Sequence, residues 1–90
     1  MTRAVAEELS AEHQQFIVRY LHEFHLELID YFQVFEFSIT EEKQLLRQKQ
    51  EQPQRETKIF VTLKETKPIT RTVWAMDQLD HVMILFPEDY

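Results

Sequence analysis

The hydrophobic residues between positions 11 and 26 recur at spacings of one, three and four, which is the period of an α-helix. They share one side of a helical wheel, and polar residues such as Gln15 and Arg19 fall on the other side. Ser10 is a candidate N-cap, and Glu12 lies in the first turn, where an acidic side chain favours the helix dipole. The pattern predicts an amphipathic helix at about 11–26. Its apolar arc comprises Leu9, His13, Phe16, Ile17, Tyr20, Leu21, Phe24 and Leu28.

Beyond position 30 the hydrophobic pattern changes to one typical of β-strands. Four segments are rich in β-branched and aromatic residues, which favour strands. The last of them is a continuous apolar run that ends at Pro87, as expected for a buried strand. The predicted strands are 31–39, 57–64, 69–76 and 82–86.

Two further segments have weaker patterns. Residues 43–50 place Leu45 and Leu46 among Gln, Lys and Arg, which indicates a solvent-facing strand, with a short helix as the alternative. Residues 2–6 could form a short extra strand. The sequence therefore predicts an α+β fold, with one amphipathic N-terminal helix packed on an antiparallel sheet of about four to five strands. Short connections make a meander the simplest topology.

Composition narrows the class of protein. A chain of 90 residues with 43% hydrophobic content is expected to form a single domain over residues 1–90. It contains no glycine, asparagine or cysteine, so glycine-dependent phosphate loops, the nucleophile elbow and cysteine chemistry are excluded. No apolar run approaches the roughly 20 residues of a membrane-spanning helix. The N-terminal residues lack the apolar stretch of a signal peptide, so we expect a cytoplasmic protein without a membrane partner.

The charge is distributed unevenly along the chain. The formal net charge is −6, yet residues 43–72 contain eight Lys or Arg side chains and only three acidic ones. The segments on either side, 1–42 and 73–90, are strongly acidic. A basic middle segment thus separates two acidic ones. Both the basic segment and the acidic residues are candidate surfaces for a partner.

Three segments together resemble a known family. They are Asp30–Phe37, Gln50–Pro53 and Pro68-Ile69, the last followed by Met76–Tyr90. Their order and spacing are similar to the bacterial domain of unknown function 960 family, found in Firmicutes and their mobile elements. Ala4 stands where that family has a glycine, and Gln78-Leu79 stand where it tends to have Asp-Gly. The resemblance implies a small bacterial or phage-borne cytosolic domain and no particular activity.

The candidate chemical groups predict neither an enzyme nor a metal site. His22 and His25 lie three residues apart on the helix without a third ligand, whereas a zinc site needs about three converging protein ligands. His13 lies in the apolar arc, where a half-buried histidine with a hydrogen-bond partner is the simpler interpretation. Asp77 and Asp80 lie in a turn, where Asp commonly caps the backbone. We therefore expect no catalytic residue, no metal and no cofactor.

The leading hypothesis is a non-catalytic protein-interaction domain. It would be a phage- or mobile-element-associated modulator or inhibitor of a host protein, for example a defence nuclease. The first alternative is a nucleic-acid-binding accessory protein that uses the basic segment 43–72, with Phe60 or Trp74 stacking on a base. The second is a self-associating structural protein that dimerises through residues 31–39 or 82–86. The candidate binding residues are Glu7, Glu8, Glu12 and Glu23 on the acidic side and Arg47, Lys49, Arg55 and Lys58 on the basic side.

Overall fold

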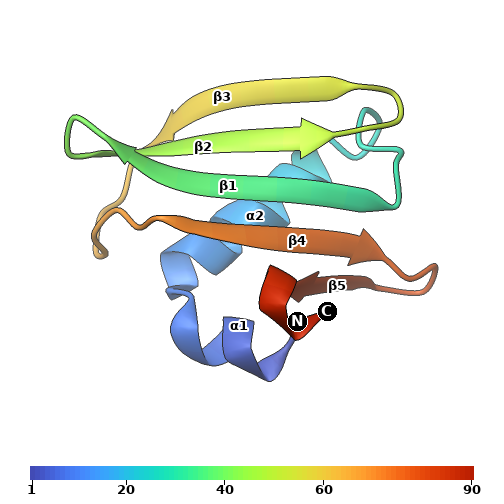
Figure 1. Ribbon diagram of the computed structural model, residues 1–90, viewed down its shortest axis with the longest axis horizontal. Coiled ribbons are helices and arrows are strands. Elements are labelled where there is room, and N and C mark those ends of the chain that lie inside the picture. The colour runs from blue at the N-terminus through green and yellow to red at the C-terminus, as the bar shows by residue number, and fades with distance from the viewer.

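The computed structural model describes residues 1–90 and has two helices on one side of a five-stranded sheet (Figure 1). The α+β class and the strand number predicted from the sequence are confirmed. None of the helices is long and apolar enough to cross a lipid bilayer. The elements are α1 (Arg3–Glu8), α2 (Ala11–Glu23), β1 (Phe32–Thr40), β2 (Lys43–Gln50), β3 (Arg55–Val61), β4 (Arg71–Asp77), β5 (Val82–Leu85) and the 3-10 turn η1 (Pro87–Asp89).

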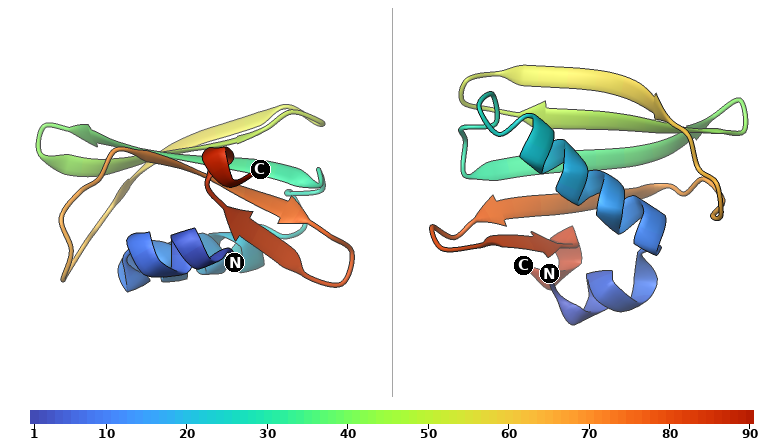
Figure 2. Two further views of the ribbon diagram at one scale, coloured as in Figure 1. Left: turned by 60° about the horizontal axis from the view of Figure 1, so that its bottom comes forward. Right: turned by 180° about the vertical axis from the view of Figure 1, so that it is seen from behind.

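The sheet is antiparallel throughout, with the strand order β3-β2-β1-β4-β5. The strands β1, β2 and β3 form a meander, and β4 and β5 form a hairpin. The connection over residues 62–70 then passes from β3 at one edge to the far side of β1. The predicted simple meander is therefore wrong at this one connection, which makes β1 the central strand. Figure 2 shows the connection lying at the end of the sheet, on the side that faces the helices.

The helices begin with the side-chain caps that favour helix starts. The Ser10 hydroxyl accepts a hydrogen bond from the His13 N–H, as predicted from the sequence, and α2 ends at Glu23, slightly before the predicted end. Residues 3–8 form α1, not the predicted short strand. The Thr2 hydroxyl caps α1 by accepting a hydrogen bond from the Val5 N–H. Val5 is fully buried, so α1 adds one side chain to the core.

A single hydrophobic core lies between the helices and one face of the sheet. It contains side chains from α1, α2 and each of the five strands. Phe35 of β1 is fully buried at its centre, and the Tyr20 ring of α2 packs edge-on against it with ring centroids 5.6 Å apart. The core cluster comprises Val5, Leu9, Ile17, Tyr20, Phe35, Phe37, Leu46, Val61, Val73, Ala75, Ile84 and Phe86.

Strand β2 differs from the predicted solvent-facing strand, because one of its two faces is buried beneath α2. Every second residue of β2 points into the core, and three of these four residues are glutamines: Gln44, Gln48 and Gln50. Their amides are satisfied by hydrogen bonds. Gln48 Nε2 donates to Gln33 Oε1 at 2.7 Å, and Gln33 Nε2 donates to Gln50 Oε1 at 2.6 Å. No buried side-chain nitrogen or oxygen lacks a partner, so the polar face is compatible with burial.

His13 is buried in this interior, more deeply than the half-buried position predicted for it. The predicted hydrogen-bond partner is present. His13 Nε2 lies 2.9 Å from Gln44 Oε1, and His13 Nδ1 lies 2.5 Å from Ser10 Oγ. Gln44 Nε2 donates to the Ile69 carbonyl at 3.0 Å, and Gln44 Oε1 accepts from the Ile69 N–H at 2.8 Å. These hydrogen bonds join α2 and β2 to the end of the 62–70 connection.

Candidate functional site

The face of the sheet opposite α2 carries no helix (Figures 1 and 2). Only the C-terminal turn covers part of it, where the Tyr90 ring meets Trp74 with centroids 6.0 Å apart. Cross-strand neighbours on this side are apolar and half-buried, and Val34 is paired with Trp74. We call this surface the open face. Its apolar stripe consists of Phe32, Val34, Trp74, Met76 and Met83.

Three of the four candidate basic residues lie on the open face beside this stripe. Lys49 Nζ contacts Glu36 Oε2 at 3.2 Å, and Arg47 Nε contacts Glu56 Oε2 at 3.6 Å. Lys58 makes no ion pair within the molecule. The charges of Arg47 and Lys49 are therefore partly neutralised in place by acidic side chains on neighbouring strands.

Arg55, the fourth candidate, points to the opposite side of the sheet. Its Nη1 donates to the Tyr20 hydroxyl at 3.0 Å and to Gln48 Oε1 at 3.1 Å, and its guanidinium lies 5.1 Å from the Phe24 ring centroid. A stacked guanidinium with two hydrogen bonds supports the packing of α2 on the sheet. The basic segment thus splits between two faces, which the charge pattern alone could not reveal.

The four candidate acidic residues do not form one cluster. Glu7 pairs with Arg3 at 2.8 Å in α1, and Glu8 lies 3.4 Å from Arg71. Glu23 lies in the last turn of α2, eleven residues from Glu12 and therefore about 16 Å along the helix axis. Of the four, Glu23 is the residue without a hydrogen bond or ion pair within the molecule.

Glu12 joins α2 to the β3–β4 connection. Its carboxylate accepts hydrogen bonds from the backbone N–H groups of Lys64, Glu65 and Thr66 at 2.6, 2.8 and 2.8 Å, and from the Thr66 hydroxyl at 2.8 Å. These donors, led by the Lys64 and Glu65 N–H groups, lower the pKa of Glu12 to about 2. Its carboxylate is thus engaged by the protein itself.

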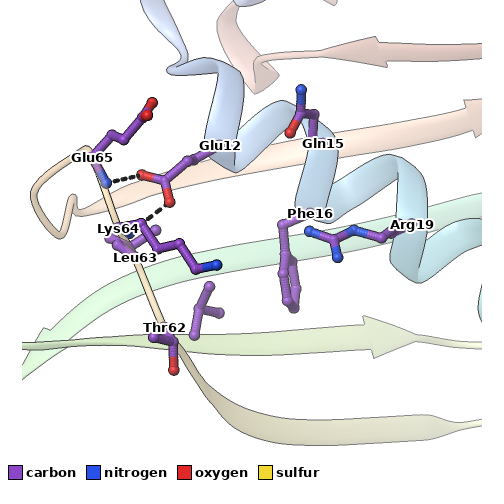
Figure 3. Close-up of a pocket in the computed structure, with 9 residues that line it drawn as sticks. Glu12, Gln15, Phe16, Arg19, Thr62, Leu63, Lys64 and Glu65 are labelled. Atoms are coloured by element: carbon purple, nitrogen blue, oxygen red, sulfur yellow. Dashed lines mark hydrogen bonds between the residues drawn. The ribbon is translucent and has the colours of Figure 1, made fainter.

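A groove runs between α2 and the edge strand β3. It consists of two adjoining cavities of about 430 Å³ and 400 Å³, which share the residues Phe16, Arg19, Val61 and Thr62. We call it the α2–β3 groove. In Figure 3 the Arg19 and Lys64 side chains reach toward Phe16 from opposite sides of the first cavity. Neither side chain forms an ion pair within the molecule. Tyr20, Phe24 and Ile59 line the second cavity.

The other candidate polar groups do not converge. His22 and His25 stack with ring centroids 6.2 Å apart, and no group of three or more His, Asp or Glu residues is placed to hold a metal ion. In the β4–β5 turn, Asp77 Oδ1 accepts a hydrogen bond from the Leu79 N–H at 2.9 Å, the capping role predicted for aspartate there. The neighbouring His81, whose side chain hydrogen-bonds to Asp80, lowers the pKa of Asp80.

The fold and its surfaces define a small α+β domain in which two helices cover one face of an antiparallel sheet and leave the other largely open. The chain belongs to the family described as "Staphylococcal protein of unknown function", domain of unknown function 960, whose model matches residues 1–89. The resemblance drawn from the sequence is thereby confirmed. Neither the comparison with curated proteins nor the comparison with solved structures found a match.

Sequence reasoning missed most of the apolar stripe and the whole α2–β3 groove. Alternation along single strands puts Trp74 and Met76 on one side of one strand, and Phe32 and Val34 on one side of another, but it does not show that the two sides adjoin. The register that places Val34 beside Trp74 joins them. The groove had no sequence signal, because Arg19 and Lys64 are 45 positions apart and look like ordinary solvated side chains.

Proposed function

We propose that this protein is a non-catalytic interaction domain that binds a protein partner through the open face. The observation that carries the proposal is the partly exposed apolar stripe along β1, β4 and β5. An exposed apolar patch rimmed by polar residues is typical of a protein-binding surface. Trp74 and Phe32 at its centre, with rings 5.0 Å apart, are the kind of aromatic anchors that dominate interface energetics.

The charges around the stripe favour a protein over a nucleic acid. Two of the basic side chains already face Glu36 and Glu56 across neighbouring strands. The whole chain carries a net charge of −6, which opposes approach to a phosphate backbone. A protein surface with apolar groups opposite Trp74 and an acidic group opposite Lys58 would match the open face.

The remaining parts of the hypothesis stay with the proposal. A bacterial cytoplasmic location and an association with phages or mobile elements rest on the family resemblance. A host protein as the partner that is modulated or inhibited rests on the acidic charge of the chain and its lack of a catalytic motif. Nucleic-acid binding is the second candidate function. The observation that favours it is the location of Arg47, Lys49 and Lys58 on the same face as Phe60 and Trp74.

Affinity capture from a nuclease-treated host lysate tests the proposal when it is combined with open-face variants. Wild-type protein should recover one stoichiometric protein partner. The double variant Val34→Lys and Met76→Lys should lose it, because two cations then lie within the apolar stripe, beside Trp74 and Phe32. Val18→Lys, at a half-exposed position of α2 on the opposite side, is the matched control and should retain the partner, and circular dichroism should show that each variant is folded.

A labelled oligo(dT) strand separates the two candidate functions. Under the protein-partner proposal the wild-type protein should not retain it at physiological salt. Retention that is lost in the triple variant Arg47→Glu, Lys49→Glu and Lys58→Glu would reject the proposal in favour of nucleic-acid binding. Recovery of the same protein partner by the Val34→Lys and Met76→Lys variant would also reject it.

A further inference from the structure

The sheet has one free edge. At the β5 edge the strand is four residues long, and the Ile84 carbonyl accepts a 2.9 Å hydrogen bond from the Thr2 N–H at the start of α1. At the other edge β3 is seven residues long and pairs only with β2. An edge strand presents unpaired backbone N–H and C=O groups along its outer side. Strand β3 therefore has room to pair with one more extended segment.

The α2–β3 groove lies directly beside this free edge. The β3 side chains that point toward α2 are Arg55, Thr57, Ile59 and Val61, and the last two line the groove. Figure 3 shows Phe16 of α2 extending into the first cavity from the helix side. A strand added to β3 would point every second side chain to the α2 side of the sheet, and hence into this groove.

The charge of the groove favours an acidic side chain in it. Arg19 and Lys64 line the first cavity and lack an acidic partner within the molecule. The Glu12 carboxylate in the same cavity is taken up by four hydrogen bonds from the β3–β4 connection. Glu65 also lines this cavity but forms no ion pair with Arg19 or Lys64. Two cations beside an aromatic floor are thus left to face a ligand.

We propose that β3 and the α2–β3 groove bind, by strand addition, an extended peptide segment of a protein partner that carries one acidic side chain two positions from an apolar one. Backbone hydrogen bonds to the β3 edge hold the segment, and its side chains give specificity. One apolar side chain enters the part of the groove lined by Tyr20, Phe24 and Ile59. An acidic side chain two positions along lies about 7 Å away and meets Arg19 and Lys64.

Other occupants fit this edge less well. A second copy of the chain paired through β3 about its central residue would place Lys58 opposite Lys58, and like charges directly opposite are destabilising. A nucleic acid would carry a phosphate at every nucleotide past the carboxylates of Glu23 and Glu65, whereas the peptide brings one acidic side chain to the part of the groove that holds Arg19 and Lys64. This peptide site does not depend on the proposed function of the open face, because its lining residues lie on the other side of the sheet.

A random heptapeptide library displayed on phage tests the proposal with defined probes. Selection on the immobilised protein should enrich peptides with an acidic residue two positions from an apolar one. A synthetic copy of an enriched peptide should slow the hydrogen exchange of alternate backbone amides in β3. Arg19→Glu should raise the dissociation constant of this peptide, measured by fluorescence anisotropy, by about tenfold or more, because a charge-assisted contact becomes a repulsion.

Lys49→Glu on the open face is the matched charge reversal and should leave peptide affinity unchanged. An equal loss in Arg19→Glu and Lys49→Glu would overturn the site, as would peptide-induced protection outside β3 or a library without enriched peptides. A second copy of the chain would be the occupant of this edge if two results were found in the free protein at high concentration. The β3 amides would be protected from hydrogen exchange, and sedimentation experiments would show dimers. Displacement of the peptide by oligo(dT) would assign the edge to nucleic acid.

Discussion

Glu41, Glu42 and Leu79 hold positive φ angles of 51°, 66° and 77°. Glu41 and Glu42 connect β1 to β2 as a two-residue turn, and positive φ at both positions is what the favoured hairpin turn requires. Glycine or asparagine would adopt these angles at less cost, but the chain contains neither. Both turns thus contain residues whose side chains disfavour the backbone conformation that they adopt.

Replacing Leu79 with glycine is expected to stabilise the protein. Leu79 is fully exposed, so its side chain contributes no burial, and its positive φ is strained for leucine. Leu79→Gly should raise the free energy of unfolding by about 0.5–1 kcal/mol, as the relief of strain exceeds the added chain entropy. Urea denaturation measures the change. Gln78→Gly is the control at a neighbouring residue with negative φ, and an equal gain there would contradict the argument.

At the scale of elements, the contact between α2 and the β3–β4 connection depends on a single carboxylate. Glu12 receives its four hydrogen bonds from residues more than fifty positions away in the sequence. The connection has to return from one edge of the sheet to β4, and Glu12 holds it beside the first turn of α2. The Gln44 amide holds the end of the same connection at Ile69. The Glu12 contact also shapes one end of the α2–β3 groove, which Lys64 and Glu65 line.

The low pKa of Glu12 predicts a pH dependence of stability. Because the folded state lowers this pKa from 4.5 to about 2, the stabilisation is fully present above pH 4.5 and is lost as the pH falls toward 2. Glu12→Gln should therefore flatten the rise of unfolding free energy with pH over this window. At neutral pH it should also speed hydrogen exchange at the amides of Lys64, Glu65 and Thr66.

Glu7→Gln is the control for this prediction, because Glu7 pairs only with Arg3 within α1. It should leave hydrogen exchange in residues 64–66 unchanged. Unaltered exchange in Glu12→Gln would show that the connection is held by other contacts, such as those of Gln44.

At the scale of the whole molecule, one core joins every element. The cluster runs from Val5 in α1 to Phe86 after β5, with Phe35 of the central strand between them. Elements that share one continuous core are expected to unfold together. The expected single domain over residues 1–90 thus predicts a single cooperative transition, even though α1 is only six residues long.

Val5→Ala tests whether α1 belongs to this unit. Val5 is fully buried, so its truncation should cost about 1–3 kcal/mol through lost burial and a cavity. Far-ultraviolet circular dichroism and Trp74 fluorescence should shift together in urea. Val18→Ala, at a half-exposed position of α2, should change stability by less than about 0.5 kcal/mol. Two separated transitions would show that α1 unfolds independently of the sheet.

The sequence by itself determined the local elements and, for many of them, which side chains share one side of the helix or strand. Periodicity identified α2 and the strands, and alternation put Val73 and Ala75 on one side of β4 and Trp74 and Met76 on the other. The structure shows that the side of Val73 and Ala75 is the buried one. These features follow from the geometry of single elements, in which each residue's direction is set by its near neighbours. The same alternation was misread for β2, because glutamine is usually exposed and becomes buried only when partners such as Gln33 satisfy its amide.

Tertiary structure decided the features that join distant residues. The 62–70 connection carries β4 across to the far side of β1, and this step places Trp74 beside Val34 and creates the apolar stripe. It also brings Lys64 opposite Arg19 and occupies the carboxylate of Glu12. Such pairings depend on the path of the chain between elements, and local side-chain preferences contain no information about that path.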